Sequence, residues 1–306
     1  MLAVYSIRPD FLAVRSTECQ DLALDGVNGQ HRSAGASSPP SRPAPWSVSG
    51  GQADRKPQRR RSWLTAKPAD PVDFAERVAT VGALYRAAPL LEALGVQVVR
   101  TDEMTGIQAL ERAAPTLPMR PGKVERREFA SIRHGTQRLI ANVQVASGAV
   151  LAPAIGPTRT EADFAAHIER TVATDPDASW VFLVDQRNTP QSEGLVRLVA
   201  RAEGLTSDLG EEGQRGLLHS MASRTAFLGA PERRIQFVYL PKHTPWPNPV
   251  ELWFSILVRR LLRRASFAST DDLRARLLAF IAYFNQTAKP FRWTYTGRAL
   301  TISTLG

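Results

Sequence analysis

Three acidic residues occupy positions suited to phosphoryl-transfer chemistry. Asp102 and Asp185 each follow an apolar run typical of a strand, and Glu251 falls in the first turn of an expected helix after a third such run. Hard divalent cations prefer carboxylate oxygens, and two ions about 3.5 to 4 Å apart stabilise both the entering and the leaving oxygen. One acid at a strand end is more often a helix cap or a solvated turn residue, but the joint placement predicts a site for two Mg²⁺ or Mn²⁺ ions.

Two of the elements that carry these acids read as strands. The β-branched run at 96–99 leads into Asp102, so we expect a strand that ends at residues 101–103. The run from Trp180 to Val184 is wholly apolar, as expected for a strand buried on both faces, and it ends at Asp185. Both acids are therefore predicted to lie where strands end.

The third acid is expected on a helix. A strand over 235–240 leads into a Pro-rich segment that closes with Asn248 and Pro249. Asparagine suits the N-cap of a helix, and proline suits the first helical position, where its missing N–H is not needed. We expect this helix to carry Glu251 in its first turn and to run to about Arg264.

The remaining elements complete a mixed α/β order. The expected elements are an amphipathic helix over about 71–87, a β-hairpin of 138–146 and 149–155 around Ser147-Gly148, a helix capped by Thr160 that runs to about 174, a helix over about 192–203 and a last helix capped near Ser269 or Thr270. This order predicts a ribonuclease-H-like mixed sheet flanked by helices.

Composition divides the chain into two parts. Residues 33–61 are rich in Ser, Pro, Gly and Arg and lack any helical or strand period, so residues 1–62 are predicted to be a disordered basic tail. Residues 63–306 are predicted to form one domain, with a glycine-rich insertion at about 205–234 that holds one helix of its own.

Charge and cysteine content narrow the functional class. The formal net charge of +10 favours a polyanionic partner such as nucleic acid, although a basic surface that binds nothing would give the same number. The single cysteine, Cys19, excludes an internal disulfide, and no stretch reaches the roughly 20 apolar residues of a membrane helix. We expect a cytoplasmic protein, and the excess of Arg over Lys suggests a bacterial source, where it would be associated with the nucleoid.

Several motifs resemble the mariner-like insertion-sequence transposases that contain a DDE endonuclease domain. The motifs are Asp102-Glu-Met-Thr-Gly-Ile-Gln-Ala-Leu-Glu111, Ile132-Arg-His-Gly-Thr136, Val184-Asp-Gln-Arg-Asn188, the segment from Pro241 to Leu257, and Lys289-Pro-Phe-Arg-Trp-Thr294. They follow the family's order from about Trp63 to Leu300.

This resemblance implies an activity and a set of roles. The family's enzymes hydrolyse DNA at the ends of the element with Mg²⁺ and then attack target DNA with the freed 3′ hydroxyls, acting as dimers on paired ends. Asp102, Asp185 and Glu251 match the family's three acidic metal ligands. Asn188 and Asn248 match accompanying asparagines that we expect to position loops or a water molecule, and Glu103 and His243 are further candidates for supporting the metal ligands.

Candidate DNA contacts lie on both sides of Asn248. Lys242 and Trp246 precede it, and Trp246 could either stack on an unpaired base or pack in the core. Trp253 is expected in the core, because it shares a helical stripe with apolar neighbours. A basic band of Arg259, Arg260, Arg263 and Arg264 could grip phosphates, although a solvated helix face is the commoner fate of such a run.

Departures from the family pattern leave a second reading open. Arg187, Pro190 and Gln144 stand where relatives carry an apolar residue, a histidine and an aspartate, and residues 1–62 show no helix-turn-helix module. We therefore expect a truncated copy that has lost specific end binding. The alternative is a noncatalytic remnant that binds DNA without cutting it, and another nuclease of the same fold, such as a ribonuclease H or a resolvase, fits the closing motif less well.

Overall fold

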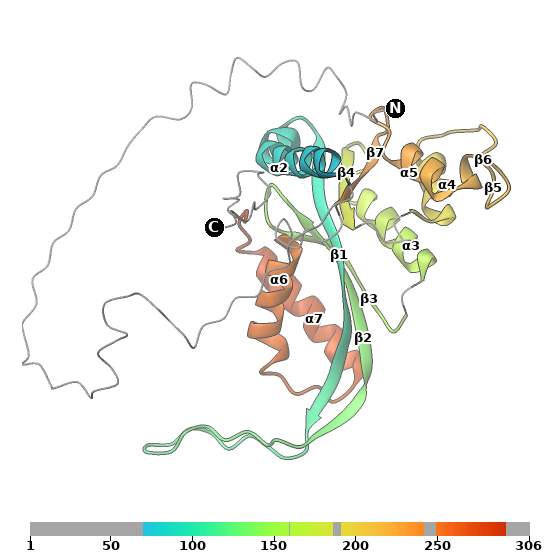
Figure 1. Ribbon diagram of the computed structural model, residues 1–306. Helices are drawn as coiled ribbons and strands as arrows, with labels where there is room; N and C mark the ends of the chain where they lie inside the picture. The colour runs from blue at the N-terminus through green and yellow to red at the C-terminus, as the bar shows by residue number, and fades with distance from the viewer. Residues whose placement is uncertain (1–69, 159, 186–190, 242–248, 292–306) are drawn as a thin grey trace, which may run out of the picture. The chain divides into compact units, whose positions relative to one another are not determined.

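A computed structural model of the chain describes residues 70–158, 160–185, 191–241 and 249–291 (Figure 1). Its main sheet has five strands in the order β3-β2-β1-β4-β7. The strands are β1 (Val96–Arg112), β2 (Ser131–Gln144), β3 (Val150–Gly156), β4 (Ser179–Asp185) and β7 (Ile235–Leu240). The β1–β2 and β2–β3 pairs are antiparallel, and the β1–β4 and β4–β7 pairs are parallel. This confirms the predicted ribonuclease-H-like mixed sheet.

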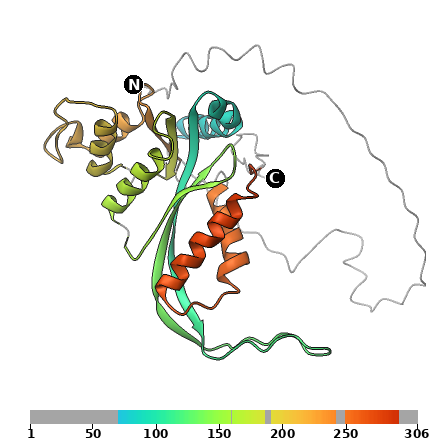
Figure 2. The ribbon, with the colours of Figure 1, turned by 180° about the vertical axis from the view of Figure 1, so that it is seen from behind.

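Helices flank this sheet and bury two apolar clusters. The helices are α2 (Pro71–Ala93), α3 (Glu161–Val172), α4 (Glu193–Ala202), α5 (Met221–Leu228), α6 (Pro249–Leu257) and α7 (Thr270–Asn285). One cluster joins β4 and β7 to α3, α4 and α5 through residues such as Phe182 and Phe237. The other joins β1 and β2 to α6 and α7 through residues such as Leu139 and Trp253. Figures 1 and 2 show α6 and α7 side by side along the β1–β2 pair.

Strand β1 differs from the prediction in its length. It was expected to end at residues 101–103, but it continues to Arg112. The reason is that β1 has two different partners: its parallel pairing with β4 stops at Arg100, whereas its antiparallel pairing with β2 extends to Arg112. Asp102 therefore lies inside a strand but just past the end of its parallel pairing, which a local reading of the apolar run could not distinguish.

Two helices also depart from their predicted bounds. Helix α2 continues past 87 to Ala93 with Pro89 inside it, although an interior proline removes one backbone hydrogen bond and disfavours the helix. The helix predicted to run from Pro249 to about Arg264 ends as an α-helix at Leu257 and continues as a π-helical turn, Val258–Leu262. The wider π turn shifts the side chains that follow around the helix axis.

The other helices begin at the residues that the sequence suggested. Thr160 and Asp163 form a reciprocal capping box at the start of α3, Ser192 caps α4, and Ser269 caps α7 through the backbone N–H of Asp272. Each cap satisfies backbone donors that the first helical turn leaves without partners. The local signals at these three helix starts were therefore sufficient.

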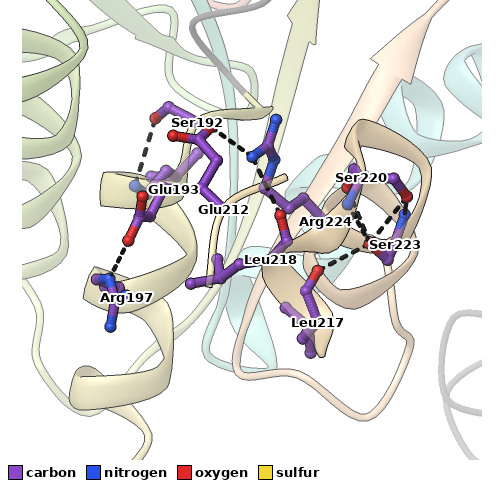
Figure 3. Close-up of polar contacts among 10 residues, drawn as sticks. Ser192, Glu193, Arg197, Glu212, Leu217, Leu218, Ser220, Ser223 and Arg224 are labelled. Carbon is purple, nitrogen blue, oxygen red and sulfur yellow. Dashed lines mark hydrogen bonds and ion pairs between the residues drawn. The ribbon is translucent and has the colours of Figure 1, made fainter. Parts of the chain in front are cut away.

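The segment at 205–234 folds around a buried arginine. It holds a two-residue hairpin, β5 (Gly210–Glu211) and β6 (Arg215–Gly216), a short 3-10 turn, Leu217–His219, and helix α5. Arg224 on α5 donates to Glu212 at 2.6 Å and lies near the carbonyl oxygen of Leu218 at 3.4 Å (Figure 3). Ser220 and Ser223 form a capping box at the start of α5. Among the helices that the structure describes, none is long and apolar enough to cross a membrane.

Candidate active site

The register of two parallel strands brings Asp102 and Asp185 to the same level. Arg100 on β1 pairs with Leu183 on β4, and each aspartate lies two residues further along its own strand. Carboxyl ends of adjacent parallel strands share one edge of a sheet, which is where sites of open α/β sheets form. The side chains of Asp102 and Asp185 are 17% and 38% exposed, so both carboxylates reach solvent from a partly buried position.

A buried arginine bridges the two carboxylates. The side chain of Arg100 is 0% exposed, and its Nη2 lies 2.6 Å from Oδ1 of Asp185 and 3.8 Å from Oδ2 of Asp102. Its Nη1 donates to the backbone carbonyl oxygens of Thr101 at 2.7 Å and Leu183 at 2.9 Å. Sequence reasoning missed this residue. The signal was present, because residues two apart on a strand point to the same face, which places Arg100 beside Asp102.

A chain of buried polar side chains holds β1 beside the acids. Thr101 donates its hydroxyl to Oδ1 of Asn142 on β2, and Asn142 donates through Nδ2 to the hydroxyl of Thr171 on α3 at 2.6 Å. Thr171 in turn donates to the carbonyl oxygen of His167 at 2.8 Å. Since Thr101 and Asp102 are neighbours that point to opposite faces, this chain fixes the strand from the face opposite the carboxylates.

Tyr85 on α2 contributes a neutral group to the same surroundings. Burial raises the pKa of Tyr85 well above its usual value, and the charges of Arg100 and Asp185 are near enough to shift it further in opposite directions. The phenol therefore stays protonated at neutral pH. Tyr85 belongs to the amphipathic helix that the sequence predicts over about 71–87, and its proximity to the site depends on how α2 packs.

Glu251 lies in the first turn of α6 as predicted and is exposed. The opposite face of this helix is a buried stripe of Val250, Trp253, Phe254 and Leu257, and the predicted core position of Trp253 is confirmed by its 0% exposure. The stripe sets which way Glu251 points. Over the four described ranges, no three His, Cys, Asp or Glu side chains come close enough together to hold a metal ion.

The supporting residues fall into two groups. Glu103 follows Asp102 on β1 and lines a cavity of about 250 Å³ that also involves Arg138 and Arg170, so its side chain belongs to a different surface from the aspartate pair. Apart from the arginines that follow α6, the other candidates for support and DNA contact lie outside the described residues; they are Asn188, Lys242, His243, Trp246 and Asn248. Their roles remain predictions.

The basic band has a changed geometry. Arg259, Arg260, Arg263 and Arg264 are all exposed, but they lie on and after the π-helical turn, so the α-helical spacing that put them on one face does not apply. Arg259 is already engaged, because its Nε donates to the carbonyl oxygen of Ser255 at 3.1 Å. The band remains a cationic surface next to the helix that carries Glu251.

Gln144 joins an amide cluster at the end of β2. Its Nε2 donates to Glu92 at 2.8 Å and to Gln97 at 2.6 Å, while its Oε1 accepts from the hydroxyl of Ser147. These contacts tie α2, β1 and the β2–β3 turn together. Gln144 thus has a structural role in this protein, because it connects these three elements.

A family model fits the part of the chain that contains all three acids. The model describes the DDE superfamily endonuclease, and it matches residues 97–274, which is more than half of the chain. The chain belongs to the DDE superfamily endonucleases. The match begins at the start of β1 and ends within α7, so it includes the sheet and the helix of Glu251.

Solved structures similar to this DDE endonuclease include several of the Mos1 mariner transposase. A paired-end complex with Mn has 11% identity and a TM-score of 0.44, and the match covers 82% of this chain and 75% of that one. A paired-end complex with the left transposon end has 13% identity and a TM-score of 0.42, with 89% and 78% covered. The Mos1 catalytic domain has 11% identity and a TM-score of 0.39, with 72% and 85% covered. No curated protein matches the chain.

The carboxylate oxygens of the endonuclease are the type of ligand that a hard divalent cation prefers. Asp102 and Asp185 present carboxylate oxygens at one level of the sheet, and both already face a cationic group. Glu251 comes from a separate element, the first turn of α6. The carboxylate pair is thus built to hold positive charge.

Proposed function

We propose that the chain is the catalytic domain of a mariner-like DNA transposase, which cleaves DNA strands at the ends of an insertion sequence and joins them to target DNA. One observation carries the proposal. In a chain of the DDE endonuclease family, the β1–β4 register brings Asp102 and Asp185 to one level at the solvent-accessible end of the parallel pairing. Paired carboxylates at this place are the ligands that metal-assisted phosphoryl transfer requires.

Asp102, Asp185 and Glu251 would hold two Mg²⁺ or Mn²⁺ ions, which when bound polarise the scissile phosphate and activate the attacking oxygen. The rest of the work belongs to the protein. The strand register fixes the two aspartates, and the polar chain through Asn142 holds β1 from behind. The buried stripe of α6 keeps Glu251 on the exposed face of that helix.

DNA is the proposed partner, both as element ends and as target, bound by a homodimer. The net charge of +10 supports a polyanionic ligand. The exposed arginines that follow α6 place cationic groups close in sequence to Glu251, where contacts to phosphates would position a strand at the acids. We propose that Lys242 and Trp246 contribute to the same surface.

Asp185→Asn tests this function. Asparagine keeps an oxygen that can accept from Arg100, so the fold should persist, but it loses the charge that a divalent ion needs. We expect Mn²⁺-dependent nicking of supercoiled DNA to fall at least about a thousandfold, as for the loss of a group essential to transition-state stabilisation, while DNA binding in a gel-shift assay stays within about twofold.

Asp177→Asn is the matched control. Asp177 is exposed and lies before β4 rather than at its end, so the variant makes the same chemical change at the opposite end of the strand. It should nick DNA like the wild-type chain. Equal nicking by the Asp185→Asn and Asp177→Asn proteins would reject the proposed role of Asp185.

A second candidate function is supported by the bridging arginine. A noncatalytic remnant that binds DNA would need no cation at Asp102 and Asp185 other than Arg100. Arg100 forms ion pairs with both aspartates. Within the described residues, no three metal-ligating side chains lie close enough together to hold a metal ion. This candidate predicts binding of DNA with no Mn²⁺-dependent nicking by the wild-type chain at any Mn²⁺ concentration.

A further inference from the structure

We propose that Arg100 is a built-in counter-cation that competes with divalent metal for Asp102 and Asp185, so that this chain binds metal weakly until the guanidinium is displaced. The inference rests on the proposed function, because it assigns the metal site to the same carboxylates. It goes further by naming the residue that sets the metal affinity of the site.

The first step is the position of the charge. Nη2 of Arg100 is within hydrogen-bonding distance of Oδ1 of Asp185, and it is 3.8 Å from Oδ2 of Asp102. A divalent ion shared by the two aspartates would coordinate oxygens of the same carboxylates at about 2.0 to 2.6 Å. The guanidinium and the ion would therefore stand side by side on one pair of ligands, and each would repel the other.

The second step is that Arg100 has nowhere to withdraw within this conformation. Its side chain is 0% exposed, and Nη1 is tied to two backbone carbonyl oxygens, one on β1 and one on β4. Those carbonyls belong to paired strands of the main sheet, so the guanidinium cannot move away from them without breaking these hydrogen bonds or distorting the sheet. Movement would require a buried charge to break three hydrogen bonds, which costs free energy unless new partners replace them.

The third step is charge balance. A guanidinium remains protonated in proteins, so Arg100 contributes a full positive charge beside the two carboxylates. Two carboxylates carry two negative charges, and Arg100 neutralises one of them. The pair therefore offers a divalent ion about half the charge that it would offer without Arg100, and this weakens binding of any divalent metal.

Titration calorimetry of the full chain with Mn²⁺ tests the proposal. Arg100→Met removes the charge and keeps a long side chain to fill the buried space, and Arg100→Lys keeps a charge in the matched control. We expect the Arg100→Met protein to bind Mn²⁺ at least about tenfold more tightly than the wild-type chain, a modest figure for removing a unit charge about 4 Å from an ion at a partly buried site. The Arg100→Lys protein should bind no more than about threefold more tightly than the wild-type chain, because its charge persists.

A second substitution locates the ion, and a second variant guards against misfolding. Adding Asp185→Asn to the Arg100→Met protein should abolish the gained affinity, because the ligand is lost. If circular dichroism shows that Arg100→Met is unfolded both in EDTA and in Mn²⁺, the smaller and more polar Arg100→Gln takes its place with the same expectation. If either variant is unfolded in EDTA but folded in Mn²⁺, that result would itself support the proposal.

The outcomes separate this inference from the function on which it rests. Equal and tight Mn²⁺ binding by the wild-type and Arg100→Met proteins, lost in Asp185→Asn, would overturn the competition while leaving the metal site intact. If the Arg100→Lys protein bound Mn²⁺ as tightly as the Arg100→Met protein, the competition would also be overturned. The size of the side chain rather than its charge would then control the affinity for Mn²⁺. Absence of Mn²⁺ binding by all folded variants would overturn both the inference and the proposed metal-dependent function.

Discussion

Asn142 is the residue whose loss should weaken the support of the acids most directly. Its side chain is 0% exposed, accepts from the hydroxyl of Thr101 and donates to that of Thr171. Asn142→Leu keeps a similar volume but removes both hydrogen bonds. Thr171 retains the carbonyl oxygen of His167 as a partner, whereas Thr101 loses the acceptor of its hydroxyl. Most of the loss in the free energy of unfolding should therefore come from the buried hydroxyl of Thr101.

The magnitude follows from these contacts. Two buried hydrogen bonds contribute about 0.5 to 1.5 kcal/mol each, and a hydroxyl left buried without a partner costs about 1 to 3 kcal/mol. Asn142→Leu should therefore lower the free energy of unfolding by about 2 to 6 kcal/mol. With a urea dependence of about 2 to 3 kcal/mol per molar, as for a domain of this size, the unfolding midpoint followed by tryptophan fluorescence should fall by about 1 to 2 M.

A double-mutant cycle gives the decisive comparison. Thr101→Val removes the hydroxyl that Asn142→Leu leaves without an acceptor, so the double variant should be at least about 1 kcal/mol more stable than the two separate losses predict. Strictly additive losses, or a loss below about 0.5 kcal/mol for Asn142→Leu alone, would refute the reasoning that this polar chain holds β1 in place.

Two further predictions concern a buried histidine and a turn. Burial lowers the pKa of His167 to about 3 from its ordinary value of 6.5. The unfolded chain therefore takes up a proton that the folded chain excludes. The contribution of neutral His167 to the free energy of unfolding is fully present above pH 6.5 and is lost as the pH falls. Urea unfolding should show that the wild-type chain loses about 2 kcal/mol more than a His167→Leu variant between pH 7 and pH 5, and parallel pH profiles would contradict this. Gly148, in the β2–β3 turn, has φ +75°, and a Cβ there would lie 2.1 Å from the carbonyl oxygen of Lys289, whereas Gly106, with φ +72°, has open space. Gly106→Ala should lower the free energy of unfolding by about 1 to 2 kcal/mol, because only its left-handed backbone is strained. Gly148→Ala should lower it clearly more, as followed by thermal unfolding. Equal losses in the two variants would show that the turn does not pack against Lys289 as described.

Much of the fold could be predicted because its signals are local. The capping box of Thr160 and Asp163, the apolar run that ends at Asp185 and the turn at Ser147-Gly148 each depend on residues within a few positions of one another. The mixed α/β order followed from these elements. The family resemblance then named Asp102, Asp185 and Glu251 as the acids, and their roles as metal ligands stay a prediction.

The rest depends on partners far away in the sequence. The continuation of β1 to Arg112 comes from its pairing with β2, and polar residues in that stretch concealed the strand. The π-helical turn after Leu257 breaks an α-helical spacing that the sequence leaves intact. Arg100 was overlooked because an arginine in an apolar strand reads as an exception until both of its carboxylate partners are placed.

The central claim is that Asp102, Asp185 and Glu251 together hold divalent metal. Anomalous diffraction from crystals of the wild-type chain and of the Arg100→Met variant, each soaked in Mn²⁺, tests it most directly. The account predicts Mn²⁺ within about 2.5 Å of carboxylate oxygens of Asp102 and Asp185, with Glu251 drawn toward the ion, and with higher occupancy in the variant. Crystals of both proteins without Mn²⁺ at these carboxylates would contradict it.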